Sequence, residues 1–198
     1  MSKTTLKKFL SELNREQLAE VIIQVYESRK EAREFLDYFA NPDEKAALDK
    51  YRAVIMKEFQ PLKGRAKRRV SVCRKAIKDF STLQPSVSAT ADLALTYVEQ
   101  LIIHLVRNPA QVTESHKREM VAKLQQTIEF ITVECLGGEF GIRIESIAAT
   151  IPHAGKEIEN EISEFFCTGT PSANIVPLAT RKPTSLRKFI SRRHRQQF

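Results

Sequence analysis

The feature that most constrains the fold is an apolar segment in the middle of the chain, residues 88–107. Its large apolar residues lie on nearly every side of a helix: Leu93, Leu95, Val98, Leu101, Ile102, Leu105 and Val106. A helix that is apolar all round has to be covered by other elements on several sides. We therefore predict that it is the central element of the second half. Four polar or charged residues interrupt the run and argue against a membrane span: Asp92, Glu99, Gln100 and His104.

Apolar residues recur three and four positions apart through most of the remaining chain up to residue 166. Start and stop signals divide this pattern into helices. We predict helices at residues 3–13, from Asn14 with Gln17 as a capping box, at 30–40, from Asn41-Pro42 to Phe59, from Val70 to Phe80, at 88–107, from Thr113 to a stop at Gly137-Gly138, and at 153–166. The second of these carries one apolar stripe, made of Leu18, Val21, Ile22, Val25 and Tyr26.

The segment from Phe140 to Ile151 allows two interpretations. Phe140, Ile142 and Ile144 alternate as in a strand. A helix through Phe140, Ile144, Ile147 and Ile151 accounts for more residues. We predict the helix and keep the strand as the alternative.

These segments predict an all-α fold, in which residues 1–166 form one helical domain and residues 167–198 a flexible basic tail with a short amphipathic helix. The helix pairs recur at roughly forty residues, as in an irregular HEAT-like stack of helical hairpins. A compact multi-helix bundle is the alternative.

Charge is distributed very unevenly along the chain. Residues 57–78 contain nine Lys or Arg against one acid, residues 79–166 contain six against thirteen acids, and residues 167–198 contain seven and no acid. The net charge of +8 therefore understates the polarity of the chain. Such a layout favours an acidic partner for the basic segments, or pairing with the chain's own acidic half.

The basic segment between the two halves is the first candidate site. Lysines and arginines clustered at a helix edge neutralise phosphates with little sequence preference. The candidate residues for binding nucleic acid or another polyanion are Lys63, Arg65, Lys67, Arg68, Arg69, Arg74, Lys75 and Lys78. The helix from Val70 is expected to bury Cys73 as a small hydrophobe and to turn Arg74, Lys75 and Lys78 outward.

The end of the tail is the second candidate site. Three apolar residues share one side of a short helix, and basic residues occupy the rest. The candidate residues for binding a partner are Leu186, Arg187, Lys188, Phe189, Ile190, Arg192 and Arg193. A helix this short is marginal alone in water, and its apolar side is too small for stable membrane attachment. We expect it to order against a partner or against its own domain.

No catalytic signature is recognisable. His116 with Glu119 and His153 with Glu157 could each offer two metal ligands, but such pairs arise often in Glu-rich helices, and we expect solvated surface pairs. His104, inside the apolar helix, is expected to be a hydrogen-bonded core or boundary histidine. No Cys-x-x-Cys, Gly-x-Ser-x-Gly or phosphate loop occurs, so we expect no metal and no cofactor. The three cysteines lack framework spacing, which predicts a reducing, cytoplasmic location.

Three segments carry a family resemblance: SKTTLKKFLSELNREQLAEVIIQVYE, NPDEKAALDKYRAVIMKEF and SVCRKAIKDFSTLQPSVSATADLALTYVE. From Met1 to about Glu99 the chain resembles an uncharacterised bacterial domain-of-unknown-function family of small helical proteins. The resemblance implies a bacterial, cytoplasmic, all-helical protein and brings no catalytic residues. We expect a non-enzymatic interaction module that binds an acidic partner, nucleic acid or protein. The alternative is an enzyme whose site is built from scattered carboxylates and histidines.

Overall fold

The computed structural model describes residues 2–156, 158–160 and 162. Over this part of the chain no strand occurs, and the all-α fold is confirmed. The helices are α1 (Lys3–Glu12), α2 (Arg15–Ser28), α3 (Lys30–Ala40), α4 (Glu44–Phe59), α5 (Val70–Thr82), α6 (Val87–Arg107), α7 (Glu114–Val133) and α8 (Gly137–Thr150), with short 3₁₀ turns η1 (Pro109–Gln111) and η2 (Ile151–Ala154). The helix predicted for residues 140–151 is confirmed, with Phe140, Ile147 and Ile151 buried.

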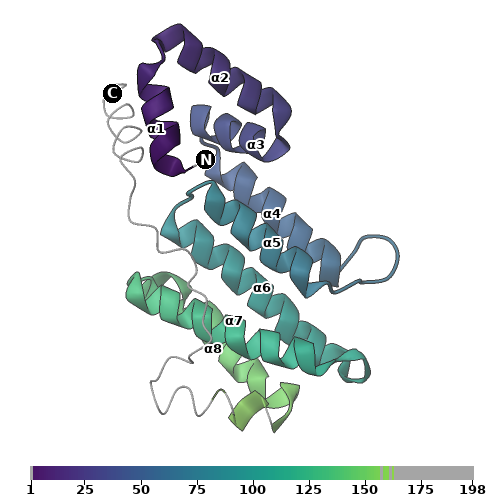
Figure 1. Cartoon of the computed structure of the whole chain (residues 1–198). Helices are drawn as coiled ribbons and strands as arrows, with labels where there is room; N and C mark the ends of the chain where they lie inside the picture. The colour runs from purple at the N-terminus through teal and green to yellow at the C-terminus, as the bar shows by residue number, and fades with distance from the viewer. Residues whose placement is uncertain (1, 157, 161, 163–198) are drawn as a thin grey trace.

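The helices are arranged in chain order along the molecule, with α1–α3 at one end and α8 at the other (Figure 1). Helix α6 lies between them and packs against α4, α5, α7 and α8. It is long and apolar enough to cross a membrane by length and composition alone, but 72% of that window is buried inside the protein. Its central position, predicted from the apolar run, is confirmed. The HEAT-like arrangement stays a prediction.

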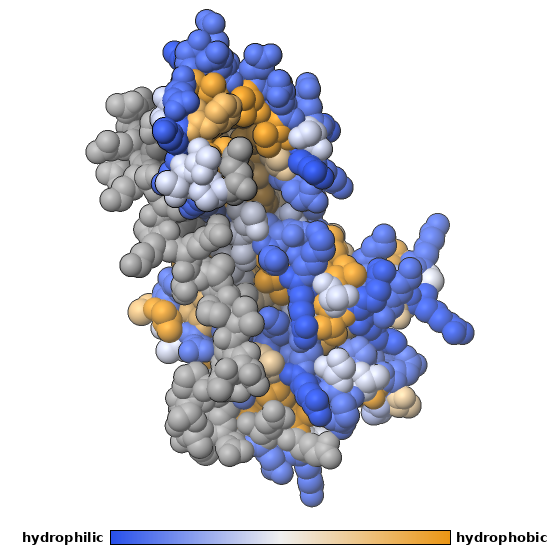
Figure 2. Space-filling model, in the orientation of Figure 1, coloured by the Kyte–Doolittle hydropathy of each residue, from blue (hydrophilic) through white to orange (hydrophobic). Residues whose placement is uncertain are grey.

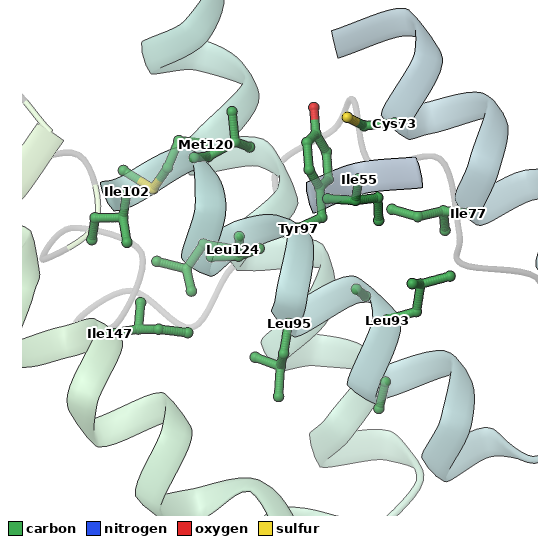
Figure 3. Packing of buried hydrophobic residues seen from close by; sticks show 14 of the residues in the cluster. Ile55, Cys73, Ile77, Leu93, Leu95, Tyr97, Ile102, Met120, Leu124 and Ile147 are labelled. Atoms are coloured by element: carbon green, nitrogen blue, oxygen red, sulfur yellow. The ribbon is translucent and has the colours of Figure 1, made fainter. Parts of the chain in front are cut away.

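The core lies on both sides of α6. Figure 3 shows Ile55, Cys73 and Ile77 on one side and Met120, Leu124 and Ile147 on the other. These residues come from α4, α5, α7 and α8, and each is at most 5% exposed. Burying a side chain of this size stabilises the fold by about 2 kcal/mol. The two halves of the chain therefore share one core through α6.

Ion pairs also join α4 and α8 to α6. Arg143 on α8 donates from Nε to Glu99 at 2.8 Å and from Nη1 to Asp92 at 2.5 Å. Arg52 on α4 donates to the other oxygen of Asp92 at 2.6 Å. The two acids that interrupt the apolar run of α6 are thus neutralised by the neighbouring helices.

Helices α1–α3 lie at the edge of this core. None of their residues is buried, although Phe35 and Tyr38 of α3 are partly buried and pack against it. Five large apolar side chains on α1 and α2 are 45–56% exposed: Leu6, Phe9, Ile22, Ile23 and Val25. Figure 2 shows apolar side chains gathered on the surface that α1–α3 form. Part of the stripe predicted on α2 is therefore exposed to solvent.

Several helix boundaries confirm the predicted caps. Asn14 and Gln17 form the capping box of α2, with hydrogen bonds of 2.8 and 2.9 Å. Thr113 caps α7. Asn41 was wrongly predicted as the cap of α4: the cap is Asp43, which accepts from the amide of Ala46 at 2.9 Å. Its carboxylate accepts from an orphan amide of the first turn, a role that aspartate and asparagine fill equally well.

Two other predicted boundaries were wrong. Gly137-Gly138 does not stop α7 but begins α8, because Cys135 already makes the turn with a φ of 57°. The helix predicted from His153 begins later. Ile151–Ala154 is a 3₁₀ turn, and Gly155 breaks it with a φ of 118° before the helical residues that start at Lys156.

Candidate polyanion interface

The α4–α5 loop, residues 60–69, carries most of the predicted basic site. Helix α4 ends at Phe59 because Pro61 cannot donate the hydrogen bond that would continue it. Gly64 and Arg68 adopt positive φ values of 83° and 53°, which turn the chain back toward α5. In Figure 1 the loop projects from the α4–α5 pair. Lys63, Arg65 and Lys67 are exposed on it.

Arg69 anchors the C-terminal end of this loop. Its guanidinium donates to both oxygens of Glu58, at 2.6 and 3.1 Å, and its backbone amide donates to the same carboxylate at 3.1 Å. Glu58 is only 5% exposed. The hydrogen bonds from Arg69 hold the pKa of the Glu58 carboxyl below its usual value. Arg69 thus lies at the surface but is paired with a buried carboxylate of the same chain.

Arg74 is also engaged internally. On α5 it donates to the carboxylate of Glu119 on α7, and Tyr97 on α6 donates its hydroxyl to the same carboxylate at 3.2 Å. The hydrogen bond to Glu119 raises the pKa of the Arg74 guanidinium. One buried acid therefore connects three consecutive helices.

The other two candidate cations on α5 differ from each other. Lys75 pairs with Asp79 one turn later at 2.8 Å. Lys78 is exposed, and the described residues offer it no carboxylate. The eight predicted cations therefore fall into two groups. Arg69, Arg74 and Lys75 are paired internally, whereas Lys63, Arg65, Lys67, Arg68 and Lys78 form no ion pair with any described acid.

Arg68 is held by its backbone. Its amide donates to the carbonyl of Glu58 at 2.9 Å. Its carbonyl oxygen lies 3.4 Å from Nε2 of His116. Since Nδ1 of His116 accepts from the amide of Thr113 at 3.3 Å, the neutral ring carries its proton on Nε2, facing Arg68. The imidazole of His116 thus connects the cap of α7 to the α4–α5 loop.

A recess of about 560 Å³ lies between this loop and η1. It is lined by Arg65, Ala66, Arg68 and Gln111. The guanidinium of Arg68 donates to Oε1 of Gln111, which connects the two walls. Lys63 and Lys67 are exposed on the same loop as the recess. Figure 2 shows hydrophilic side chains extending on the side of the molecule where the loop projects in Figure 1.

His104 lies behind this surface. It is 3% exposed, and its ring meets that of His116 edge to face, with centroids 5.1 Å apart. The prediction of a core histidine is confirmed, but the predicted hydrogen bond is not: neither ring nitrogen has a hydrogen-bond partner within the described part of the chain. Burial, then electrostatic interactions with Arg68 and His116, lower the pKa of His104 to about 4. The His104 ring also packs against the ring of Phe59, with centroids 6.2 Å apart.

The other predicted chemical groups are placed as follows. Glu119 accepts hydrogen bonds from Arg74 and Tyr97, and His116 is hydrogen-bonded to Thr113 in the cap of α7. His116 and Glu119 are therefore not the solvated surface pair that was predicted, and they do not share a metal site. The described residues hold no group of three or more His, Cys, Asp or Glu positioned for a metal. Cys73 is fully buried as predicted, and burial raises its thiol pKa to about 12. Glu157 lies outside the described residues, as do the tail candidates from Leu186 to Arg193.

Sequence reasoning did not single out Glu58 or Gln111. Glu58 is the one acid among nine bases in residues 57–78, which was a usable signal for an internal ion pair. Gln111 carried no signal, because its contact with Arg68 spans 43 positions along the chain.

The fold defines the class of protein, an all-α protein, whose α4–α5 loop is anchored at its end by the ion pair of Arg69 with Glu58. The chain belongs to a family of unknown function, DUF6155, whose model matches residues 1–165. The resemblance stated for residues 1–99 is thereby confirmed and extended to residue 165. The bacterial origin stays a prediction. No curated protein and no solved structure matches the chain significantly.

Proposed function

We propose that this protein is a non-enzymatic interaction module that binds an acidic partner, nucleic acid or acidic protein, at the α4–α5 loop. The basic tail of residues 167–198 supplies a second cationic contact through the candidate residues between Leu186 and Arg193. The free thiols of Cys73 and Cys135 accord with a reducing location, and we propose the cytoplasm.

The observation that supports this proposal is the division of the basic cluster. Arg69 and Arg74 satisfy buried carboxylates and so fix the loop and α5 in place. Lys63, Arg65, Lys67 and Arg68 lie on the loop, and none of the described acids pairs with them. Four cations held on an anchored loop have a lower ordering cost on binding than the same cations on a free segment.

Binding measurements at two salt concentrations test the proposal. The variant Lys63→Gln/Arg65→Gln/Lys67→Gln removes three loop charges. The matched control Lys3→Gln/Lys7→Gln/Lys8→Gln removes three exposed charges from α1. Fluorescence anisotropy is measured with labelled DNA, RNA and polyglutamate at about 50 and about 200 mM salt.

We expect wild-type affinity for at least one of these polyanions to fall steeply with salt, because binding releases counterions. The loop variant should lose about tenfold in affinity at the lower salt and show a shallower salt dependence. The α1 control should stay close to wild type. Equal losses in the two variants would contradict a localised interface, and failure of the wild type to bind any of the three would remove the proposal.

A further inference from the structure

The recess between the α4–α5 loop and η1 has a distinct donor arrangement. Its lining contains two guanidinium groups and one carboxamide, from Arg65, Arg68 and Gln111, and no acid. Arg65 and Arg68 come from the loop, whereas Gln111 comes from η1. Positive charge and polar donors therefore reach the recess from two separate walls.

Arg68 is ordered before any ligand arrives. Its backbone is held by Glu58 on one side and by His116 on the other. Its side chain is held toward η1 by the hydrogen bond to Gln111. A guanidinium has five N–H donors, so this bond leaves others for a ligand. An arginine fixed in this way binds an anion at a smaller entropic cost than a mobile one.

The hydrogen bond with Arg68 shows which end of the Gln111 carboxamide can donate to a ligand. Arginine can only donate, so the atom of Gln111 that faces it is the oxygen, Oε1. The amide nitrogen of the same carboxamide is then free to donate elsewhere, and the described residues supply no hydrogen-bond acceptor for it. The recess thus combines two positive charges with a neutral donor.

We propose that this recess binds a phosphate group, so that the acidic partner of the proposed interface is a phosphate-bearing molecule instead of an acidic protein. A tetrahedral phosphate presents several acceptor oxygens in different directions, which suits donors from two walls better than a planar carboxylate does. The volume of about 560 Å³ leaves room for a sugar and base beside the phosphate. This inference rests on the proposed function, because the recess is part of the same interface, and it commits to phosphate as the ligand chemistry.

The phosphate has two possible sources, a nucleic-acid backbone or a free nucleotide. Wild type and variants are therefore titrated with a single-stranded oligonucleotide, a nucleoside monophosphate, inorganic phosphate and polyglutamate, all at one low salt concentration. Isothermal titration calorimetry serves the small ligands, and anisotropy serves the polymers. Thermal melts of each variant confirm folding.

The key variant is Gln111→Glu. Its carboxylate can still accept from Arg68, so the wall contact is kept, but it repels phosphate and removes the amide donor. The matched control is Gln24→Glu on exposed α2, which changes the net charge equally. A second variant, Arg65→Gln, alters the exposed loop alone and is informative if the first does not fold.

We expect Gln111→Glu and Arg65→Gln each to weaken oligonucleotide binding by about tenfold relative to Gln24→Glu. If the wild type binds the monophosphate or inorganic phosphate but no oligonucleotide, and the same variants weaken that binding, the recess is supported as a phosphate site. The same result would contradict the nucleic-acid form of the proposed function. Oligonucleotide binding that Gln111→Glu and Gln24→Glu change equally overturns the recess and leaves the loop interface standing. Tighter binding of polyglutamate than of the oligonucleotide also overturns the phosphate proposal.

Discussion

Arg74 on α5 and Glu119 on α7 form a bidentate ion pair, with Nε of Arg74 at 2.9 and 3.0 Å from the two carboxylate oxygens. The Glu119 side chain is 3% exposed, whereas that of Arg74 is 57% exposed. The acid is therefore buried, and its counter-charge reaches it from the surface. Tyr97 supplies a further hydrogen bond from inside the core.

Replacement of Arg74 by glutamine should destabilise the fold by about 2 kcal/mol. The loss leaves a buried carboxylate without its counter-ion, and the exposed position of Arg74 moderates the cost because water can enter. Urea denaturation of the variant measures the change. The control is Lys78→Gln, one turn further along the same helix, which should shift the free energy of unfolding by less than about 0.5 kcal/mol. Equal effects of the two substitutions would show that the pair contributes nothing to stability.

Melting temperatures should distinguish the loop cations that stabilise the fold from those that only lie at the surface. The combined Lys63→Gln/Arg65→Gln/Lys67→Gln variant should melt close to wild type, because these side chains lie in solvent. Arg69→Gln should melt clearly lower, because Glu58 loses both guanidinium hydrogen bonds. Differential scanning calorimetry compares the two. A triple variant that melts as low as Arg69→Gln would mean that the loop lysines pair with the acidic half.

His104 should make the protein sensitive to mild acid. Its folded pKa of about 4 lies below the ordinary 6.5, so the unfolded chain binds the proton more readily. The contribution of neutral His104 to the free energy of unfolding is therefore fully present above pH 6.5. It is lost as the pH falls toward 4, and the loss is about 3 kcal/mol.

The substitution His104→Phe isolates this contribution from that of the carboxylates. Phenylalanine keeps an aromatic ring beside Phe59 and His116 but cannot be protonated. Urea unfolding at several pH values between 7.5 and 4 gives the difference between variant and wild type, which should move in favour of the variant as the pH falls. A constant difference over that range would exclude His104 as the source.

Helices α1–α3 should exchange their amide hydrogens faster than α6. None of their residues is buried, whereas most of α6 is. Local opening of such elements requires less free energy than global unfolding. Hydrogen–deuterium exchange with mass spectrometry measures protection by segment. Equal protection in α2 and α6 would indicate that α1–α3 are covered by another surface in solution.

Helix positions and the identity of the core were predictable because both follow from local periodicity and end signals. The apolar run of α6 had to be covered, and it is. The capping residues Asn14 and Thr113 act on amides three positions away, so their effect is visible in a short window. The cap of α4 lies two residues later than predicted, at Asp43, whose carboxylate can cap a helix as an asparagine can.

The pairing of charges was less predictable, because it depends on which helices become neighbours. Arg74 and Glu119 lie 45 positions apart, and no pattern within either helix connects them. The same limit applies to the apolar stripe of α2. Its period correctly shows that one face is apolar, but Ile22 and Val25 stay exposed because coverage depends on the tertiary arrangement.

The position of α6 at the centre of the core has a consequence for synthesis on the ribosome. Once Arg107 has emerged, the face of α6 toward Ile55 and Ile77 can be covered by chain already made. The opposite face stays bare until Met120 and Leu124 follow. For that interval the nascent chain exposes an apolar helix face, and transiently exposed apolar surface of this kind promotes aggregation.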